Sequence, residues 1–448
     1  MKPDGDVLKI SHRKVWLLAG PIILSNISVP LVGAVDTAVV GHLPYPQAIG
    51  GVALGALIFS FLYWGFGFLR MGTTGFVAQA VGSNDLQGLS NTILRVILLA
   101  IGLGGLAIII GWPLIDLALY LIDSSPMVEA LAADYAHIRI WSAPAVLCVY
   151  AFTGIFIGMH NTKAVFILQL VLNLSNIALD LIFVLVFSWG IEGVALASLI
   201  AEYLAMATGF YLLRQPIRRA IASFDLAQLA EKQSLLLLFS ANANIFVRTL
   251  CLLFAFSYFT AVGAGMGEVT LAANAILLHL QSIMAYGLDG FAHAVEALAG
   301  SAYGAGKLKP FRRAVVLTSI SSAGIALLAG FIYLVAGEQI IGLFTTIAEV
   351  RAQAMIYLPW MIIAPIVSVW SFQLDGIFIG TGHTREMRNA MIFSLLVYLG
   401  FLYWSIDAYA THGLFMGLAV FMAVRALSLL YYYPGIEAAI RVKQDVAA

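Results

Sequence analysis

Stretches of about 20 mostly apolar residues recur along this chain from Val15 to Gly435, with short polar segments between them. A helix of that length crosses the hydrocarbon core of a bilayer and satisfies all its backbone hydrogen bonds internally. Of the 448 residues, 62% are hydrophobic and only 10% are charged, whereas soluble proteins carry about 25% charged residues. The chain is therefore predicted to be an all-α integral membrane protein.

We predict twelve transmembrane helices. Their approximate ranges are 14–41, 50–80, 91–113, 135–160, 164–188, 193–213, 234–262, 270–302, 313–336, 352–380, 389–409 and 413–433. The 23 Lys and Arg residues balance the 23 Asp and Glu residues, so net charge favours no nucleic-acid partner. Cys148 and Cys251 lie inside apolar runs and are expected to be free thiols.

Basic residues are concentrated at the amino terminus and in alternate gaps between the predicted spans. These positions include Lys9, Arg13, Lys14, Lys163, Arg214, Arg218, Arg219, Lys232, Lys307, Lys309, Arg312, Arg313, Arg385, Arg388, Arg441 and Lys443. The other gaps contain one basic residue between them, Arg351. Because positively charged loops stay in the cytoplasm, we expect a multi-pass protein of the cell's inner (plasma) membrane with both termini cytoplasmic.

An internal repeat divides the chain into two halves. The sequence GIFIG at 154–158 returns unchanged at 376–380, an offset of 222, and the same offset pairs Gly65 with Gly287 and Gly82 with Gly304. We therefore predict an amino-terminal six-helix lobe (1–213), a cytoplasmic linker (214–233) and a carboxy-terminal six-helix lobe (234–448). Six spans per repeat make the halves parallel, as in transporters whose substrate path lies between two lobes.

Ionisable side chains inside the predicted spans are the candidates for chemistry, because a charge at mid-membrane is costly. Asp36 lies deep in the first span, while Asn173, Asn176 and Asp180 are spaced to share one face of the fifth. Two carboxylates in a medium of low dielectric do not both stay ionised cheaply, so the pair would exchange a proton. Sodium bound by the same oxygens, or a purely structural hydrogen-bond cluster, is the alternative.

Three residues are candidates for assisting this site. Pro21 and Pro30 interrupt the first span and are expected to kink it near Asp36, because proline removes a helix hydrogen bond. Tyr135 begins the fourth span, where its hydroxyl would reach the carboxylates. The more ordinary interpretation places Tyr135 in the aromatic belt at the membrane surface.

The second half lacks the Asn-Asn-Asp pattern and carries a different polar set. Its members are Arg248, Asp289, Glu296 and Asp375. Arg248 is expected to neutralise Asp375 or Glu296, either as a structural ion pair or as part of a site. No phosphate-binding loop, zinc-protease motif or nucleophile elbow occurs in the sequence. We therefore expect that the protein is not an enzyme and binds no cofactor. The coupling ion is expected to be a proton, with sodium as the alternative.

Five segments resemble the multidrug and toxic compound extrusion (MATE) family, and most closely its DNA-damage-inducible protein F (DinF-like) branch. They are PIILSN (21–26), DTAVVGHL (36–43), FLRMGTTGFVAQA (68–80), LDGFAHAVEA (288–297) and LDGIFIG (374–380). The resemblance implies two six-helix bundles, a monomer in membrane lipid, and export of small organic compounds, often cationic or amphipathic, in exchange for protons or sodium.

The resemblance also implies roles for individual residues. The family's cation site in the amino-terminal lobe is similar to Asp36, Asn176 and Asp180 here, and its bending first helix matches Pro21. Where another branch has an acid in span seven, this chain has Arg248, which favours protons over sodium. A lipid-linked precursor flippase is the remaining alternative, although few basic residues lie at mid-span.

Overall fold

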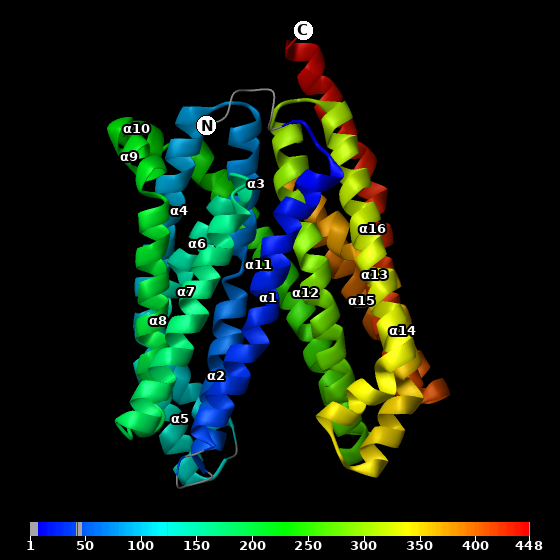
Figure 1. Ribbon diagram of the computed structural model, residues 1–448. Coiled ribbons are helices and arrows are strands. Elements are labelled where there is room, and N and C mark those ends of the chain that lie inside the picture. The colour runs from blue at the N-terminus through cyan, green and yellow to red at the C-terminus, as the bar shows by residue number, and fades with distance from the viewer. Residues whose placement is uncertain (1–7, 42, 44–46, 123, 448) are drawn as a thin grey trace. The chain divides into compact units, whose positions relative to one another are not determined.

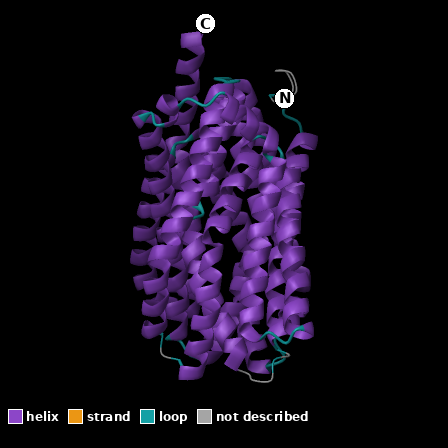
Figure 2. Cartoon of the chain, turned by 90° about the vertical axis from the view of Figure 1, so that its left-hand side faces the viewer, coloured by secondary structure: helices purple, strands orange, loops and turns teal. Residues whose placement is uncertain are grey.

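The computed structural model describes residues 8–41, 43, 47–122 and 124–447, and the side chains at 29–31, 34, 37, 446 and 447 lie outside that description. Helices make up nearly all of the described part, in which no strand occurs (Figure 2). This confirms the all-α class. Pro30, one of the two predicted kink residues, is among those whose side chains are not described.

Figure 1 labels the α-helices, and the helical segments of the first half run in the following order. They are α1 (His12–Val40), α2 (Gln47–Gly65), α3 (Phe68–Gly82), α4 (Leu86–Leu121), α5 (Pro126–Arg139), η1 (Ile140–Ser142), α6 (Ala143–Gly158), α7 (Thr162–Asp180), η2 (Leu181–Val186), α8 (Gly190–Leu212), α9 (Arg214–Ala222) and α10 (Leu226–Leu229). The second half consists of longer helices. They are α11 (Lys232–Ala264), α12 (Glu268–Gly304), α13 (Leu308–Phe344), α14 (Ala348–Thr381), α15 (Thr384–Tyr409) and α16 (Thr411–Ala447).

Eleven helical segments within the described residues are long and apolar enough to cross a membrane. In addition, α1 has 29 residues and covers the first predicted span. Large apolar side chains remain exposed on many of these helices, among them Ile109, Leu334 and Leu343. A water-soluble protein would bury such side chains, whereas a bilayer solvates them. The structure therefore agrees with the predicted twelve-helix membrane fold.

The chain packs into two compact units. The N-unit comprises Leu24–Val77 and Asp85–Leu236, and the C-unit comprises Met1–Ile23, Ala78–Asn84 and Leu237–Ala448. The helices α1, α3 and α11 therefore contribute residues to both units. The predicted lobes are continuous stretches of sequence, whereas the compact units are defined by contacts between residues. The lobe boundaries 1–213 and 234–448 therefore stay a prediction.

The two copies of the repeat make equivalent helix contacts, which are also 222 residues apart in the sequence. A Cβ atom at Gly154 would lie 2.5 Å from the carbonyl oxygen of Arg70 on α3. A Cβ atom at Gly376 would lie 2.5 Å from the carbonyl oxygen of Ala292 on α12. Residues 70 and 292 differ by 222, as do 154 and 376. The GIFIG segments are thus glycine faces that let a helix approach its neighbour's backbone in each unit, which is why both copies keep their glycines.

The predicted linker is folded against α4 of the N-unit. The Arg95 Nε donates to the carbonyl of Leu229 at 3.0 Å, and Asn91 Nδ2 donates to Gln228 Oε1 at 3.2 Å. Gln87 Nε2 donates to the carbonyl of Ser223 at 3.1 Å. These contacts hold the short helices α9 and α10 against the end of α4, so most of the linker belongs to the N-unit.

Candidate functional site

A polar cluster lies inside the N-unit, on α1 and α7. Asn173, Asn176 and Asp180 are all buried on one face of α7, with Asp180 fully buried. Asp36 on α1 and Asp180 lie within hydrogen-bonding reach of each other. The structure therefore brings together the two carboxylates that the sequence singled out, from helices far apart in the chain.

The carboxylate pair has no donor from the rest of the described protein at three of its four oxygens. These are Oδ1 of Asp36 and both oxygens of Asp180. Two ionised carboxylates only repel each other, whereas a proton on either one closes a hydrogen bond between them. Burial and the missing donors together make the pair suited to holding a single proton, or to offering oxygen atoms to a cation.

The two asparagines of α7 have different surroundings. Asn176 Nδ2 donates to Ser198 Oγ on α8 at 3.1 Å, and its Oδ1 has no donor among the described residues. Asn173 Nδ2 donates to Ser28 Oγ on α1 at 2.5 Å, while its Oδ1 accepts from Gln169. Asn173 thus ties α7 to α1, and Asn176 leaves one oxygen available beside the carboxylates.

Tyr135 lies in the core of the N-unit and not on its lipid-facing surface. Only 4% of it is exposed, and its ring packs so closely on α2 that a Cβ at Gly55 would lie 2.4 Å from Tyr135 Cδ1. Its hydroxyl lies within electrostatic range of Asp36 and Asp180. The aromatic-belt interpretation was wrong because a glycine on α2 makes room for the ring inside the bundle.

An arginine that the sequence analysis did not consider joins the cluster. Arg139 is the last residue of α5, and its Nη2 lies 3.9 Å from Glu202 Oε1 on α8. The guanidinium also lies within electrostatic range of Asp36, Asp180 and Tyr135. Its signal in the sequence was a basic residue near the start of the predicted span 135–160, because a charged residue within a membrane span needs a buried partner.

Two irregularities in helix geometry flank the cluster. Directly after Asp180, α7 widens into the π-helix η2, and directly after Arg139, α5 tightens into the 3₁₀ turn η1. Pro144 explains the second, because proline at the start of α6 cannot donate to the preceding turn. Interruptions of this kind are frequent at functional sites since they change which way adjacent side chains and carbonyls point.

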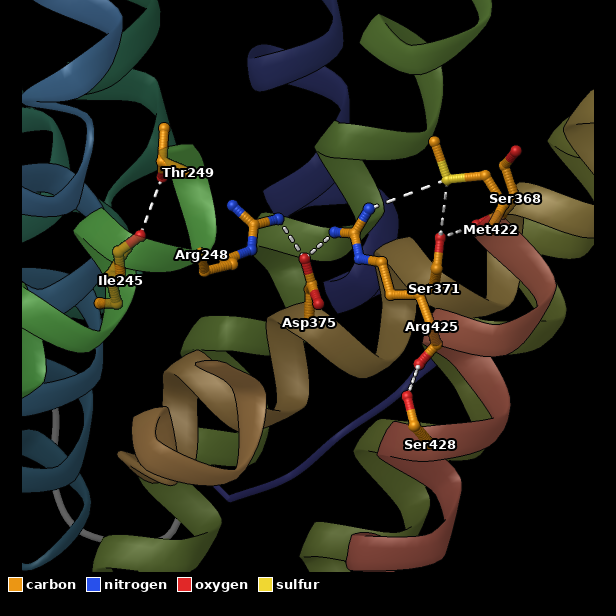
Figure 3. A network of polar contacts seen from close by, with 9 residues as sticks. All are labelled: Ile245, Arg248, Thr249, Ser368, Ser371, Asp375, Met422, Arg425 and Ser428. Carbon is orange, nitrogen blue, oxygen red and sulfur yellow. Dashed lines mark hydrogen bonds and ion pairs between the residues drawn. The ribbon is translucent and has the colours of Figure 1, made fainter. Parts of the chain in front are cut away.

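Two members of the polar set of the C-unit, Arg248 and Asp375, form a three-residue network with Arg425 (Figure 3). Asp375 Oδ2 on α14 accepts from Arg248 on α11 and from Arg425 on α16, and all three side chains are at least nine-tenths buried. Asp289 lies within electrostatic range of Arg425, while Glu296 is buried on α12. The expected partnership of Arg248 and Asp375 is present, and Arg425, which the sequence analysis missed, is a second partner.

Ion binding at these sites is limited by the groups present. No group of three or more His, Cys, Asp and Glu side chains in the described residues is arranged to hold a metal ion. In the carboxylate cluster the oxygens without donors are Oδ1 of Asp36, Oδ1 of Asn176 and both oxygens of Asp180. Such a set can exchange a proton, or bind a hard monovalent cation with added water.

A bundle of membrane-spanning helices that buries paired carboxylates at its centre has the architecture of a secondary transporter. The sequence model of the MatE family matches residues 21–182 and 245–404, once in each half of the chain. The chain belongs to the MatE family. It is accordingly a multi-pass membrane transporter of the multidrug efflux class and not an enzyme.

Relatives and solved structures agree along nearly the whole chain. DNA damage-inducible protein F of Escherichia coli is 40% identical, with 94% of this chain and 92% of that protein covered. A probable multidrug resistance protein NorM of Pseudomonas syringae is 25% identical, with 98% of each covered. A transporter of the MOP superfamily from Pyrococcus furiosus has the same fold, with a TM-score of 0.88 at 19% identity and coverage of 98% and 99%.

Proposed function

We propose that this protein exports small organic compounds from the cell in exchange for protons, and that Asp36 and Asp180 carry the coupling proton. The observation that carries this proposal is the pair itself: the fully buried carboxyl group of Asp180 and the partly buried one of Asp36 lie within reach of one hydrogen bond, with no protein donor at three of four oxygens. A proton is the smallest partner that completes this arrangement.

The pair supports an exchange cycle. When the pair opens to the cytoplasm, where protons are scarcer than outside, it releases its proton and leaves negative charge beside Asn176 and Tyr135. That charge favours a cationic substrate. When the pair opens to the outside, a proton returns, the charge is lost and the attraction for the substrate falls. Export is thereby linked to proton entry.

The substrates we propose are organic cations and amphipathic compounds. Relatives named as probable multidrug resistance proteins support this class, as does the negative charge that the pair acquires when it releases its proton. We propose that the protein works as a monomer in the plasma membrane. The distribution of basic residues favours a topology with both termini in the cytoplasm.

The test measures ethidium uptake into everted membrane vesicles, which corresponds to export from the cell, under an imposed pH gradient or an imposed sodium gradient. Asp36→Asn fixes the uncharged form, so we expect it to insert normally and to lose pH-driven transport down to the level of vesicles without the protein. Asp116→Asn is the matched control, because that carboxylate is exposed and pairs with His137 on the neighbouring helix.

Each outcome discriminates between the candidates. Wild-type rates from Asp36→Asn would show that protons travel elsewhere and would overturn the proposal. Efflux driven by sodium and not by pH would favour the sodium-coupled alternative. A lipid-linked flippase would translocate its lipid and show no ion-driven dye efflux.

A further inference from the structure

The guanidinium of Arg139 has binding capacity that its neighbours in the N-unit do not use. Its contact with Glu202, at 3.9 Å, is longer than a hydrogen bond. Its Nε and Nη1 donors have no acceptor among the described residues, although the side chain is only 16% exposed. An arginine stays charged at any physiological pH, so a permanent positive charge with two unused donors is held inside this bundle.

The acceptors missing from Arg139 are present in the same cluster. Both oxygens of Asp180 and one of Asp36 lack donors, and both carboxylates lie within electrostatic range of Arg139. Unsatisfied donors and unsatisfied acceptors thus share one buried site without being bonded to each other. Such a cluster is stable only if something bridges the two sets or if they meet in another state of the protein.

We propose that Arg139 is the residue that determines the coupling ion: its guanidinium supplies the positive charge that the ionised Asp36–Asp180 pair would otherwise recruit as sodium. This inference rests on the proposed role of the pair. When the pair loses its proton it carries two negative charges, and Arg139 compensates one of them from within the protein, so one negative charge remains to attract a cationic substrate. A sodium ion entering the same site would meet that fixed charge at close range and be repelled.

The surroundings of Arg139 support this assignment over a purely structural ion pair. A well-formed buried pair uses bidentate hydrogen bonds to satisfy both partners, and Arg139 with Glu202 does not. The helix type changes directly after Arg139, because α5 ends at this residue and the 3₁₀ turn η1 begins at the next one. Such a change alters the direction in which adjacent side chains point. The titratable groups interacting with Arg139 come from six different helices: Asp36, Tyr63, Tyr135, Tyr150, Asp180 and Glu202.

The decisive variant is the double substitution R139Q/E202Q. It removes both members of the ion pair, so no lone buried charge remains to unfold the protein and Glu202 cannot itself bind sodium. Purified protein is heated in detergent with NaCl or with choline chloride at equal ionic strength. We expect sodium to raise the melting temperature of R139Q/E202Q by a few degrees, because an ion that binds only the folded state stabilises it, and to leave wild type unchanged.

Three further variants complete the experiment. R139K keeps the positive charge and should remain insensitive to sodium. R95Q removes a positive charge elsewhere in the N-unit, where Arg95 bonds to the linker carbonyls, and should also remain insensitive. Adding D36N to R139Q/E202Q should abolish the sodium response, which locates the ion at the carboxylate pair.

Two results would overturn the inference: no sodium response in R139Q/E202Q, or a response in wild type that D36N removes. The measurement does not depend on transport. If wild type showed no pH-driven ethidium efflux while R139Q/E202Q gained an Asp36-dependent sodium response, the proposed function would fail and the role of Arg139 would stand.

Discussion

At the scale of single residues, sequence periodicity identified the carboxylate cluster but not the cations beside it. Asp36 and Asp180 were found because acids inside apolar spans are costly, and Asn176 was found because it shares a helix face with Asp180. Arg425 stands alone in an apolar run, whereas Arg139 lies near the start of a predicted span, two residues after His137. Their partners lie on other helices, at sequence distances of 63 and 50 residues, and no local spacing connects them. The coupling role of Asp36, Asp180 and Asn176 stays a prediction.

Asp375 supplies a residue-scale prediction about stability. It is the one carboxylate that the two arginines of the C-unit network share through hydrogen bonds in the described structure. Asp375→Asn leaves both guanidiniums buried without it, and removal of one partner from a buried ion pair costs about 3–5 kcal/mol. We expect a large fall in apparent melting temperature and in the yield of folded protein from detergent extracts.

Arg425→Met is the matched comparison for Asp375→Asn. It removes one positive charge but leaves Asp375 paired with Arg248, so the loss of thermal stability should be clearly smaller. Equal losses from the two variants would contradict the view that Asp375 is the centre of the network. Retained dye efflux in the folded fraction of Arg425→Met would assign the network to structure and not to transport.

At the scale of elements, the helices were predictable and their interruptions were not. Long apolar runs determine the spans, and each predicted span is helical in the structure, although the spans 50–80, 135–160 and 164–188 are each divided between two or three helical segments. The π-helix η2 directly follows Asp180, and its sequence, LIFVLV, contains no proline or glycine. This sequence is equally compatible with a regular α-helix, so the π-helix could not be predicted. Pro144 does signal the turn η1, although its effect on Arg139 depends on the packing of α5 against α8.

The glycine faces give a prediction at the same scale. Gly376→Ala adds a Cβ atom that would lie 2.5 Å from the Ala292 carbonyl oxygen, a distance that backbone atoms cannot accept without moving apart. Overpacking of this kind costs about 1–3 kcal/mol. We expect Gly376→Ala to lower the melting temperature, and Gly154→Ala to do the same in the N-unit, where the corresponding contact is with Arg70.

Gly400→Ala is the control for these glycine substitutions. It lies in α15 with no atom within 4 Å of an added Cβ. Alanine there gains helix propensity of about 0.5–1 kcal/mol, so thermal stability should be unchanged or slightly higher. If Gly376→Ala and Gly400→Ala behaved alike, close helix approach would not explain the repeated GIFIG sequence.

At the scale of the whole molecule, the repeat was the most informative feature of the sequence. It predicted two related sets of helices, and the MatE family model matches once in each half. The compact units could not be read from it, since α1, α3 and α11 contribute residues to both. Assignment of a residue to a unit depends on the contacts it makes and not on its position in the chain, so the boundary could not be found by comparing the halves.

Membrane topology is the remaining prediction at this scale. The segment 214–232 carries four basic residues and follows six predicted spans, whereas the segment 336–351 carries one. Positive residues near span ends are retained in the cytoplasm. In a background where Cys148 and Cys251 are replaced, we expect Arg218→Cys to resist a membrane-impermeant maleimide in intact cells and Glu349→Cys to react.

Both positions are exposed in the structure, so a failure to react reports the membrane and not burial within the protein. Permeabilised cells provide the control, because both cysteines should then be labelled. Labelling of Arg218→Cys in intact cells would place the linker outside. With an even number of spans before it, the amino terminus would be outside as well, and the carboxylate pair would then meet the proton gradient in the opposite sense. Such a protein would import through the cycle proposed here, so the sidedness of one linker decides whether the chemistry of Asp36 and Asp180 serves efflux.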